Sequence, residues 1–245
     1  MLVKKLSKQL NKGKIIIVPS TLGSDDISLL FPEANQHIID TCDVFIVEKI
    51  RSARRFLKKI NISKNINDLY FFELNKHQSN QDYSIILKFI NEGKNIALVS
   101  EAGYPCIADP GSKIIKIAHL NNIKIIPLIG PSSILISIIS SGLNGQNFSF
   151  VGYLPIDKLK RMKRIKELEQ LSKKNNQTQI FIETPYRNND LFKALISSCN
   201  NSTFLSISSN LTLPNQIIKT LTIEEWKYNI IDLNKKPTVF LIHKY

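Results

Sequence analysis

Short runs of apolar residues alternate with longer amphipathic segments throughout this chain, and this alternation restricts the fold more than any other feature. Each run has the length of one strand, and each intervening segment is long enough for a helix that crosses back over a sheet. The pattern predicts an α/β fold with parallel strands that are buried on both faces. The strands that we expect in the first half are Ile15–Val18, Val44–Val47, Leu69–Phe72, Ile96–Val99 and Lys124–Leu128. The helices that we expect between them are Glu33–Asp40, Arg51–Ile60, Asp82–Asn91 and Ser112–Asn121.

A second set of elements begins near Gly145, which predicts two α/β domains at residues 1–129 and 130–245. We expect a helix after Leu128 with Gly130 as its cap and Pro131 at its first helical position, because an N–H there would have no partner. The remaining expected strands are Phe148–Gly152, Gln179–Ile182, Phe204–Ser208 and Thr238–His243. The remaining expected helices are Asp157–Lys174, Asn188–Cys199 and Thr222–Tyr228.

The charge balance favours a polyanionic partner. Lys and Arg number 33 against 20 Asp and Glu, which gives a net charge of +13. Basic side chains displace counterions from phosphate backbones, so nucleic acid is the partner that this charge suits. The same excess of lysine also arises from the codon bias of an AT-rich genome, and this alternative stays open.

The compartment is expected to be the cytoplasm. The three cysteines lie far apart in the sequence and do not form a CxxC pair, which argues against a disulfide framework and favours a reducing environment. The uncharged stretch 125–146 is interrupted by Gly130-Pro131 and contains several serines, so a buried strand, a turn and a helix explain it better than a membrane span.

Three loops with unusual composition follow expected strands. Ligands of open α/β sheets bind beyond the carboxyl ends of the strands, where these loops lie. Pro19–Asp26 is rich in small residues, although a common turn with a helix cap also has this composition. Ser100–Gly111 combines two prolines, two glycines and acidic residues, and is longer than a connection requires. Gly130–Ser133 precedes a helix whose first N–H groups are free to bind a ligand.

Two segments of the second half are weaker candidates, and several common motifs are missing. Phe181–Arg187 ends a strand with a carboxylate and an arginine, and Lys235–Thr238 opens the last strand; either could be surface decoration. The Walker loop and the motifs GxGxxG, HExxH and GxSxG are absent from the sequence. The histidines are scattered, so we expect no metal site; they are His37, His77, His119 and His243.

The loop Ser100–Gly111 resembles the SDAGTPxISDPG signature of the ribosomal RNA small-subunit methyltransferase I family. This family of 16S rRNA cytidine 2′-O-methyltransferases belongs to the tetrapyrrole methylase superfamily. Pro19–Ile27 is similar to its TPIGNLDDI, and Gly130–Ser133 followed by 141–143 is similar to its GPSA and SGL. Phe148–Pro155 looks like its FxFxGFLP, and Phe181–Arg187 looks like its FYESPHR.

The sequence departs from the family pattern at three places. Glu101 stands where the family signature has Asp, and Glu48–Ser52 stands where it has EDTRH. The late RELTKxxEE motif survives only weakly, at Ser208–Thr212. These departures bear on the acceptor nucleotide more than on the cofactor.

The resemblance implies two α/β domains that hold S-adenosylmethionine in a cleft between them, and a homodimer. It also implies ribosomal RNA or the small ribosomal subunit as the substrate, with a ribose 2′-hydroxyl as the methyl acceptor. The cofactor-binding residues that it implies are Pro19, Ser100, Glu101, Ala102, Gly103, Tyr104, Ser132, Ser133, Glu183 and Thr184.

Methyl transfer to a hydroxyl requires loss of the hydroxyl proton, which calls for a base within hydrogen-bond reach. Glu48 and Glu101 are the candidate catalytic residues. Arginine suits bidentate contact with phosphates, although Arg54 and Arg55 could equally line an exposed helix face. The candidate RNA-binding residues are Arg51, Arg54, Arg55 and Arg187.

Two other functions stay open from the sequence alone. A precorrin-type tetrapyrrole C-methyltransferase would also use a basic site, because its substrate carries many carboxylates. A non-catalytic RNA-binding protein that no longer binds the cofactor would also have a basic surface, but it would not transfer methyl groups.

Overall fold

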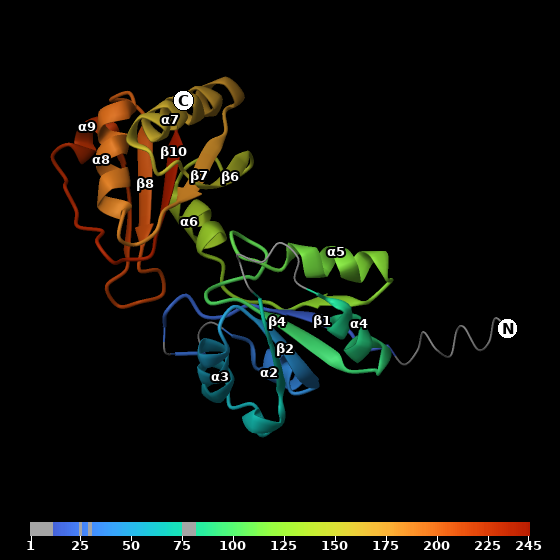
Figure 1. Ribbon diagram of the computed structural model, residues 1–245. Helices are drawn as coiled ribbons and strands as arrows, with labels where there is room; N and C mark the ends of the chain where they lie inside the picture. The colour runs from blue at the N-terminus through green and yellow to red at the C-terminus, as the bar shows by residue number, and fades with distance from the viewer. Residues whose placement is uncertain (1–11, 25, 29–30, 75–81) are drawn as a thin grey trace. The chain divides into compact units, whose positions relative to one another are not determined.

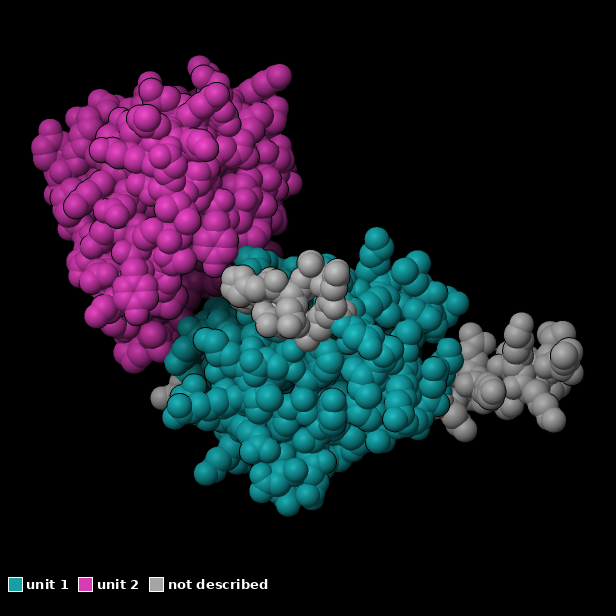
Figure 2. Space-filling model, viewed as in Figure 1, with its two compact units in different colours: residues 1–131 teal, residues 132–245 magenta. Residues whose placement is uncertain are grey.

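The computed structural model describes residues 12–24, 26–28, 31–74 and 82–245. Asp25 of the first loop and His77 lie outside the described residues. The chain divides into two compact units, Met1–Pro131 (unit 1) and Ser132–Tyr245 (unit 2), which Figure 2 shows in different colours. No helix of the described residues is both long and apolar enough to cross a membrane.

Unit 1 is a five-stranded parallel sheet with helices on both faces (Figure 1). The strand order is β3-β2-β4-β1-β5. The strands are β1 (Ile15–Val18), β2 (Cys42–Val47), β3 (Tyr70–Glu73), β4 (Asn95–Val99) and β5 (Ile125–Pro127). The helices are α2 (Glu33–Ile39), α3 (Ile50–Lys59), the 3-10 helix η1 (Ile66–Asp68), α4 (Ser84–Asn91) and α5 (Ser112–Leu120).

Alternate side chains of the unit 1 strands fill two hydrophobic layers. On one face, Val18 and Val47 pack in a cluster with Leu57 of α3 and with side chains of α2. On the other face, Ile46 packs in a cluster with Ile90 of α4 and with side chains of α5. Both faces of the sheet are therefore covered, which explains why the inner strands consist mostly of apolar residues.

Unit 2 contains a five-stranded mixed sheet in the order β6-β7-β10-β8-β9. β6 and β7 are parallel, whereas β10 runs antiparallel to β7 and β8, and β9 runs antiparallel to β8. The strands are β6 (Phe148–Tyr153), β7 (Thr178–Ile182), β8 (Phe204–Ser209), β9 (Ile217–Thr222) and β10 (Thr238–His243). The helices are α6 (Ser133–Ser141), α7 (Lys158–Asn175), α8 (Asn188–Ser198) and α9 (Ile223–Trp226).

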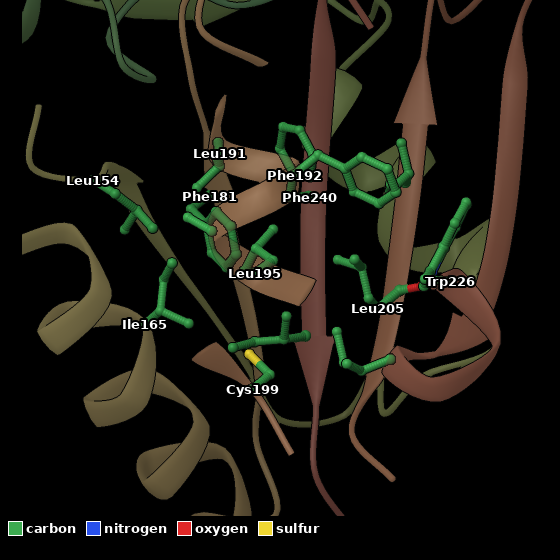
Figure 3. Close-up of a cluster of buried hydrophobic side chains, with 14 of the residues drawn as sticks. Leu154, Ile165, Phe181, Leu191, Phe192, Leu195, Cys199, Leu205, Trp226 and Phe240 are labelled. Atoms are coloured by element: carbon green, nitrogen blue, oxygen red, sulfur yellow. The ribbon is translucent and has the colours of Figure 1, made fainter. Parts of the chain in front are cut away.

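One face of the unit 2 sheet is covered by α7, α8 and α9, whose side chains form the cluster in Figure 3. Phe181 and Phe240 stack at the sheet, and Trp226 meets Phe192 edge to face. The indole Nε1–H of Trp226 donates a 2.8 Å hydrogen bond to the carbonyl of Leu205, so this large ring is buried without an unsatisfied donor.

The predicted α/β class is confirmed, and three local expectations are corrected. The strands of unit 2 are not all parallel, because the chain between β8 and β9 is too short for a crossover helix. Strand β9 had not been expected. The helix after β5 begins at Ser133 and not at Pro131, because the Ser132 hydroxyl accepts a hydrogen bond from the backbone N–H of Leu135 and acts as the N-cap.

Candidate active site

At the carboxyl end of the unit 1 sheet, neighbouring strands are followed by helices that pack on opposite faces of the sheet. β1 and β2 continue into α2 and α3 on one face, whereas β4 lies between them and continues into α5 on the other face. Connections that separate in this way open a crevice at the strand ends, where open α/β sheets bind their ligands. The loops after β1, β2 and β4 therefore define the candidate site.

The loops after β1 and β4 are joined by a two-way backbone bridge. The N–H of Ser20 donates to the carbonyl of Gly103 at 2.8 Å, and the N–H of Gly103 donates to the carbonyl of Ser20 at 3.2 Å. The Ser100 hydroxyl donates a further 2.8 Å bond to the same Gly103 carbonyl. Two of the loops selected from the sequence are thus held against each other by their main chains.

The loop after β5 is tied to both of these loops. The Tyr104 hydroxyl donates to the carbonyl of Leu128 at 3.1 Å and accepts from the N–H of Gly130 at 2.8 Å. Gly130 also lies directly against Pro19, since a Cβ added to Gly130 would stand 2.3 Å from Cγ of the proline ring. All three loops that the sequence singled out within unit 1 meet at one edge of the sheet.

The loop after β4 contains an unusual backbone. Cys106 and Ala108 have positive φ angles of 71° and 59°, although neither is glycine. Gly111 has a φ of 132°, and a Cβ on it would stand 2.9 Å from Sγ of Cys106. Left-handed conformations at non-glycine residues cost free energy and are retained where the surroundings require one loop shape. This supports a ligand-shaping role for the loop.

A cavity of about 530 Å³ lies in unit 1 where α3 faces the ends of β1, β2 and β4. Its apolar lining consists of Val47, Ala53, Phe56 and Val99. Its polar lining consists of Ser20, Thr21, Ser52, Arg55, Lys58, Lys59, Ser100 and Glu101. Ser20 is buried, and its hydroxyl has no hydrogen-bond partner among the described residues.

The two candidate catalytic carboxylates belong to neighbouring strand ends. Glu48 follows β2, and its Oε1 accepts a 3.3 Å hydrogen bond from the backbone N–H of Glu101, which follows β4. Glu48 is half-buried, whereas Glu101 is exposed and lines the cavity. The structure brings both residues to the candidate site, and which one acts as the base stays a prediction.

The candidate arginines of α3 do not share one environment. Arg55 lines the cavity. The guanidinium carbon of Arg54 lies 5.3 Å from the ring centroid of Phe71 on β3, outside the cavity lining. Arg51 is exposed near the start of the helix. Their role in binding RNA stays a prediction, and Arg55 is the member of this group that the cavity favours.

In unit 2, two candidate residues after β7 form an ion pair between a buried carboxylate, Glu183, and a partly exposed guanidinium, Arg187. Oε1 of Glu183 accepts 2.6 Å hydrogen bonds from the Arg187 guanidinium and from the Thr184 N–H. The Glu183 side chain is 0% exposed, and its Oε2 has no partner among the described residues. The pairing with the carboxylate raises the pKa of Arg187 above its ordinary value. Arg187 is therefore held by Glu183 at this strand end.

Ser20 and Thr21 belong to a loop that the sequence had marked, whereas the cavity residues Ser52, Lys58 and Lys59 of α3 had not been selected as site residues. The spacing of these residues along α3 could have identified part of the cavity lining. Ser52, Arg55, Phe56 and Lys59 follow the i, i+3, i+4, i+7 spacing and therefore share one face of α3. That spacing alone does not say whether the shared face meets a cavity or solvent.

Comparison with known proteins identifies the family. No protein-family model matches the chain. A "Ribosomal RNA small subunit methyltransferase I" of Buchnera aphidicola subsp. Schizaphis graminum is 33% identical over 205 residues, which are 83% of this chain and 67% of the relative. The protein of the same name from Buchnera aphidicola subsp. Acyrthosiphon pisum is 30% identical over 218 residues, which are 87% and 73% of the two chains. The chain belongs to the ribosomal RNA small subunit methyltransferase I family.

Solved structures agree with this assignment at the level of fold. The methyltransferase CobJ matches with a TM-score of 0.61 at 15% identity and covers 95% of this chain and 94% of its own. The precorrin-6Y methylase CbiE from Archaeoglobus fulgidus matches with a TM-score of 0.51 at 14% identity, over 96% and 99% of the two chains. The predicted resemblance to the methyltransferase I family and to the tetrapyrrole methylase fold is confirmed, and the protein is a methyltransferase.

Proposed function

We propose that this member of the methyltransferase I family transfers a methyl group from S-adenosylmethionine to a ribose 2′-hydroxyl of small-subunit ribosomal RNA. The names of the relatives support the RNA acceptor. The observation that carries the proposal within this chain is the joining of the β1, β4 and β5 loops beside a basic cavity. The net charge of +13 suits a polyanionic acceptor.

The proposed cofactor residues are Pro19, Ser100, Glu101, Ala102, Gly103, Tyr104, Ser132, Ser133, Glu183 and Thr184. S-adenosylmethionine supplies a methyl group already activated by its sulfonium. The buried Oε2 of Glu183 suits such a ligand, because an unpaired carboxylate oxygen can accept a hydrogen bond from an amine or a hydroxyl. Gly103 has both backbone polar groups bonded to Ser20, so it shapes its loop while the exposed Ala102 is expected to meet the ligand.

The chain's own contribution to the reaction is to orient the acceptor and to remove its proton. Orientation of an acceptor beside an activated donor supplies up to roughly 7–11 kcal/mol in favourable cases. Glu48 accepts a hydrogen bond from the N–H of Glu101, whereas Glu101 itself lines the cavity, and we take Glu48 as the first candidate for the base because this bond holds its carboxylate in place. Proton removal by a positioned carboxylate is worth about 10²–10⁴-fold in rate, so Glu48→Gln should lower kcat by this factor and leave the affinity for S-adenosylmethionine unchanged.

The family resemblance also supports a homodimer in the cytoplasm, where ribosomal subunits are assembled. Sedimentation equilibrium of the full chain tests the dimer. A mass that stays at 27.9 kDa at micromolar concentration would refute it.

Calorimetric titration with S-adenosylmethionine, followed by transfer of labelled methyl groups, tests the proposal. The acceptors are purified small ribosomal subunits and, in parallel, precorrin substrates. We expect cofactor binding and label in the ribosomal RNA, at ribose as shown by resistance of the methylated linkage to alkali. Label in the precorrin alone would replace the RNA acceptor with a tetrapyrrole, and failure to bind the cofactor would refute the proposal.

A further inference from the structure

We propose that the cavity beneath α3 binds one nucleotide of the acceptor RNA, with the nucleotide's phosphate held by Arg55 and Lys58. This inference rests on the function proposed above and specifies where the acceptor strand meets unit 1. It follows from the lining of the cavity, its size and the sign of its charge.

Different residues of the cavity wall suit the phosphate, the base and the hydroxyl groups of a nucleotide. Arg55 and Lys58 lie three positions apart on α3, so they project from neighbouring points of one helix face. Arginine presents a planar fork of donors that matches phosphate oxygens, and lysine adds a compact charge. Phe56 and the buried valines provide an apolar surface for the base, and Ser52 and Thr21 offer hydroxyls for polar contacts.

Buried hydrogen-bonding capacity points in the same direction. The Ser20 hydroxyl is buried and lacks a partner in the part of the chain that the structure describes, and its residue lines the cavity. Buried polar atoms in folded proteins are nearly always paired, so an unpaired one beside a cavity indicates a ligand atom or an ordered water there. The volume of about 530 Å³ falls within the range of about 300–1,000 Å³ that small-molecule sites occupy.

The sign of the charge selects the nucleotide over the methyl donor as the occupant. Three of the lining residues are basic, namely Arg55, Lys58 and Lys59, and Glu101 is the one acidic residue among them. A sulfonium cation would be repelled by such a wall, whereas a phosphodiester would be attracted to it. Ser20, Ser100 and Glu101 of the joined loops form one side of the cavity wall, and the basic residues of α3 form the other. The methyl donor is therefore assigned to the side of the joined loops, and the phosphate of the acceptor to the side of α3.

Adjacent arginines on α3 provide a matched test. Arg54→Gln and Arg55→Gln remove the same charge at consecutive positions, but the Arg54 guanidinium lies over Phe71 and Arg55 lines the cavity. The third variant is Lys58→Gln. Fluorescence anisotropy of a labelled single-stranded oligoribonucleotide measures RNA affinity of the full chain, and calorimetry measures the affinity for S-adenosylmethionine. Circular dichroism confirms that each variant is folded.

We expect Arg55→Gln and Lys58→Gln each to raise the Kd for RNA by about tenfold, because each removes a charge-assisted bond to phosphate. Each should also reduce the slope of log K against log salt by about 0.7. Arg54→Gln should raise the Kd less than twofold, and the Kd for S-adenosylmethionine should stay unchanged in all three variants.

Equal weakening of RNA binding by Arg54→Gln and Arg55→Gln would overturn the proposal, because it would mean that only the general charge of α3 matters. Loss of S-adenosylmethionine binding in Arg55→Gln with RNA affinity retained would also overturn it, by placing the cofactor in the cavity. A wild-type protein that methylates no RNA would refute the proposed function, while the anisotropy series would still decide the occupant of the cavity.

Discussion

Replacement of Gly130 by alanine tests whether the contact between the β1 and β5 loops holds the candidate site together. The added Cβ would stand 2.3 Å from Cγ and 2.7 Å from Cβ of Pro19. Carbon atoms in contact prefer about 3.5–4.0 Å, so the two loops must separate by more than about 1 Å. Overpacking of this kind costs about 1–3 kcal/mol. Alanine also lowers the conformational entropy of the unfolded chain, which stabilises the folded protein by about 0.4–1 kcal/mol.

The net expectation is a loss of about 1–2 kcal/mol from the free energy of unfolding. Urea unfolding followed by far-ultraviolet circular dichroism should show the midpoint lowered by roughly 0.5–1 M. The affinity for S-adenosylmethionine, measured by calorimetry, should fall with it, because the Pro19 loop is displaced. Gly145→Ala is the control, since its Cβ would meet Ile138 at an ordinary 4.0 Å. A Gly130→Ala protein with the midpoint and cofactor affinity of the wild type would refute this account of the site.

Three further predictions concern unit 2 and the thiols. Arg187→Met should lower the free energy of unfolding, measured in urea, by about 2–3 kcal/mol, because it leaves the buried Glu183 carboxylate without its partner. Adding Glu183→Gln to this variant should restore most of the lost free energy. If the double variant is no more stable than Arg187→Met, the pairing is contradicted. Burial lowers the pKa of His243, so the unfolded chain takes up the proton first as the pH falls below about 6.5. Stability of unit 2, followed by Trp226 fluorescence, should therefore be full above that pH and decrease below it, and an equal midpoint at pH 7.5 and 5.5 would count against this. Burial raises the pKa of Cys42 to about 12, so iodoacetamide should label it at pH 8 only after unfolding; rapid labelling of the native protein would show that the thiol is accessible.

Much of the fold was predictable because the inner strands of unit 1, β1, β2 and β4, are buried on both faces. Such burial leaves continuous apolar runs, of which β1 is the clearest, and these need no knowledge of their partners to be recognised. β9 gave no such signal, because most of its residues are partly exposed at the edge of the unit 2 sheet. The start of α6 was predicted at Pro131 but lies at Ser133, because both Pro131 and Ser132 are common at helix starts. The hydrogen bond that the Ser132 hydroxyl accepts from the N–H of Leu135 makes Ser132 the N-cap.

The candidate site was predictable only in part, because composition marks a loop but not its neighbours. The loops at Pro19 and Gly103 stood out by their small residues, whereas the bridge between them joins positions far apart in the sequence. The contrast between Arg54 and Arg55 depends on the rotation of α3, which is fixed by the packing of Ala53 and Leu57 in the core. Local sequence cannot determine that rotation.

The phenolic oxygen of Tyr104 has a consequence for how proteins of this kind can change in length. It bonds to the loop after β5 at two points, the carbonyl of Leu128 and the N–H of Gly130, and so ties that loop to the loop after β4. An insertion or deletion in the loops at the carboxyl end of the unit 1 sheet would move these two backbone groups away from the Tyr104 hydroxyl. Length variation among homologues should therefore concentrate at the amino end of the sheet, as in the turn at Asn121–Asn122, which follows α5 and is exposed to solvent.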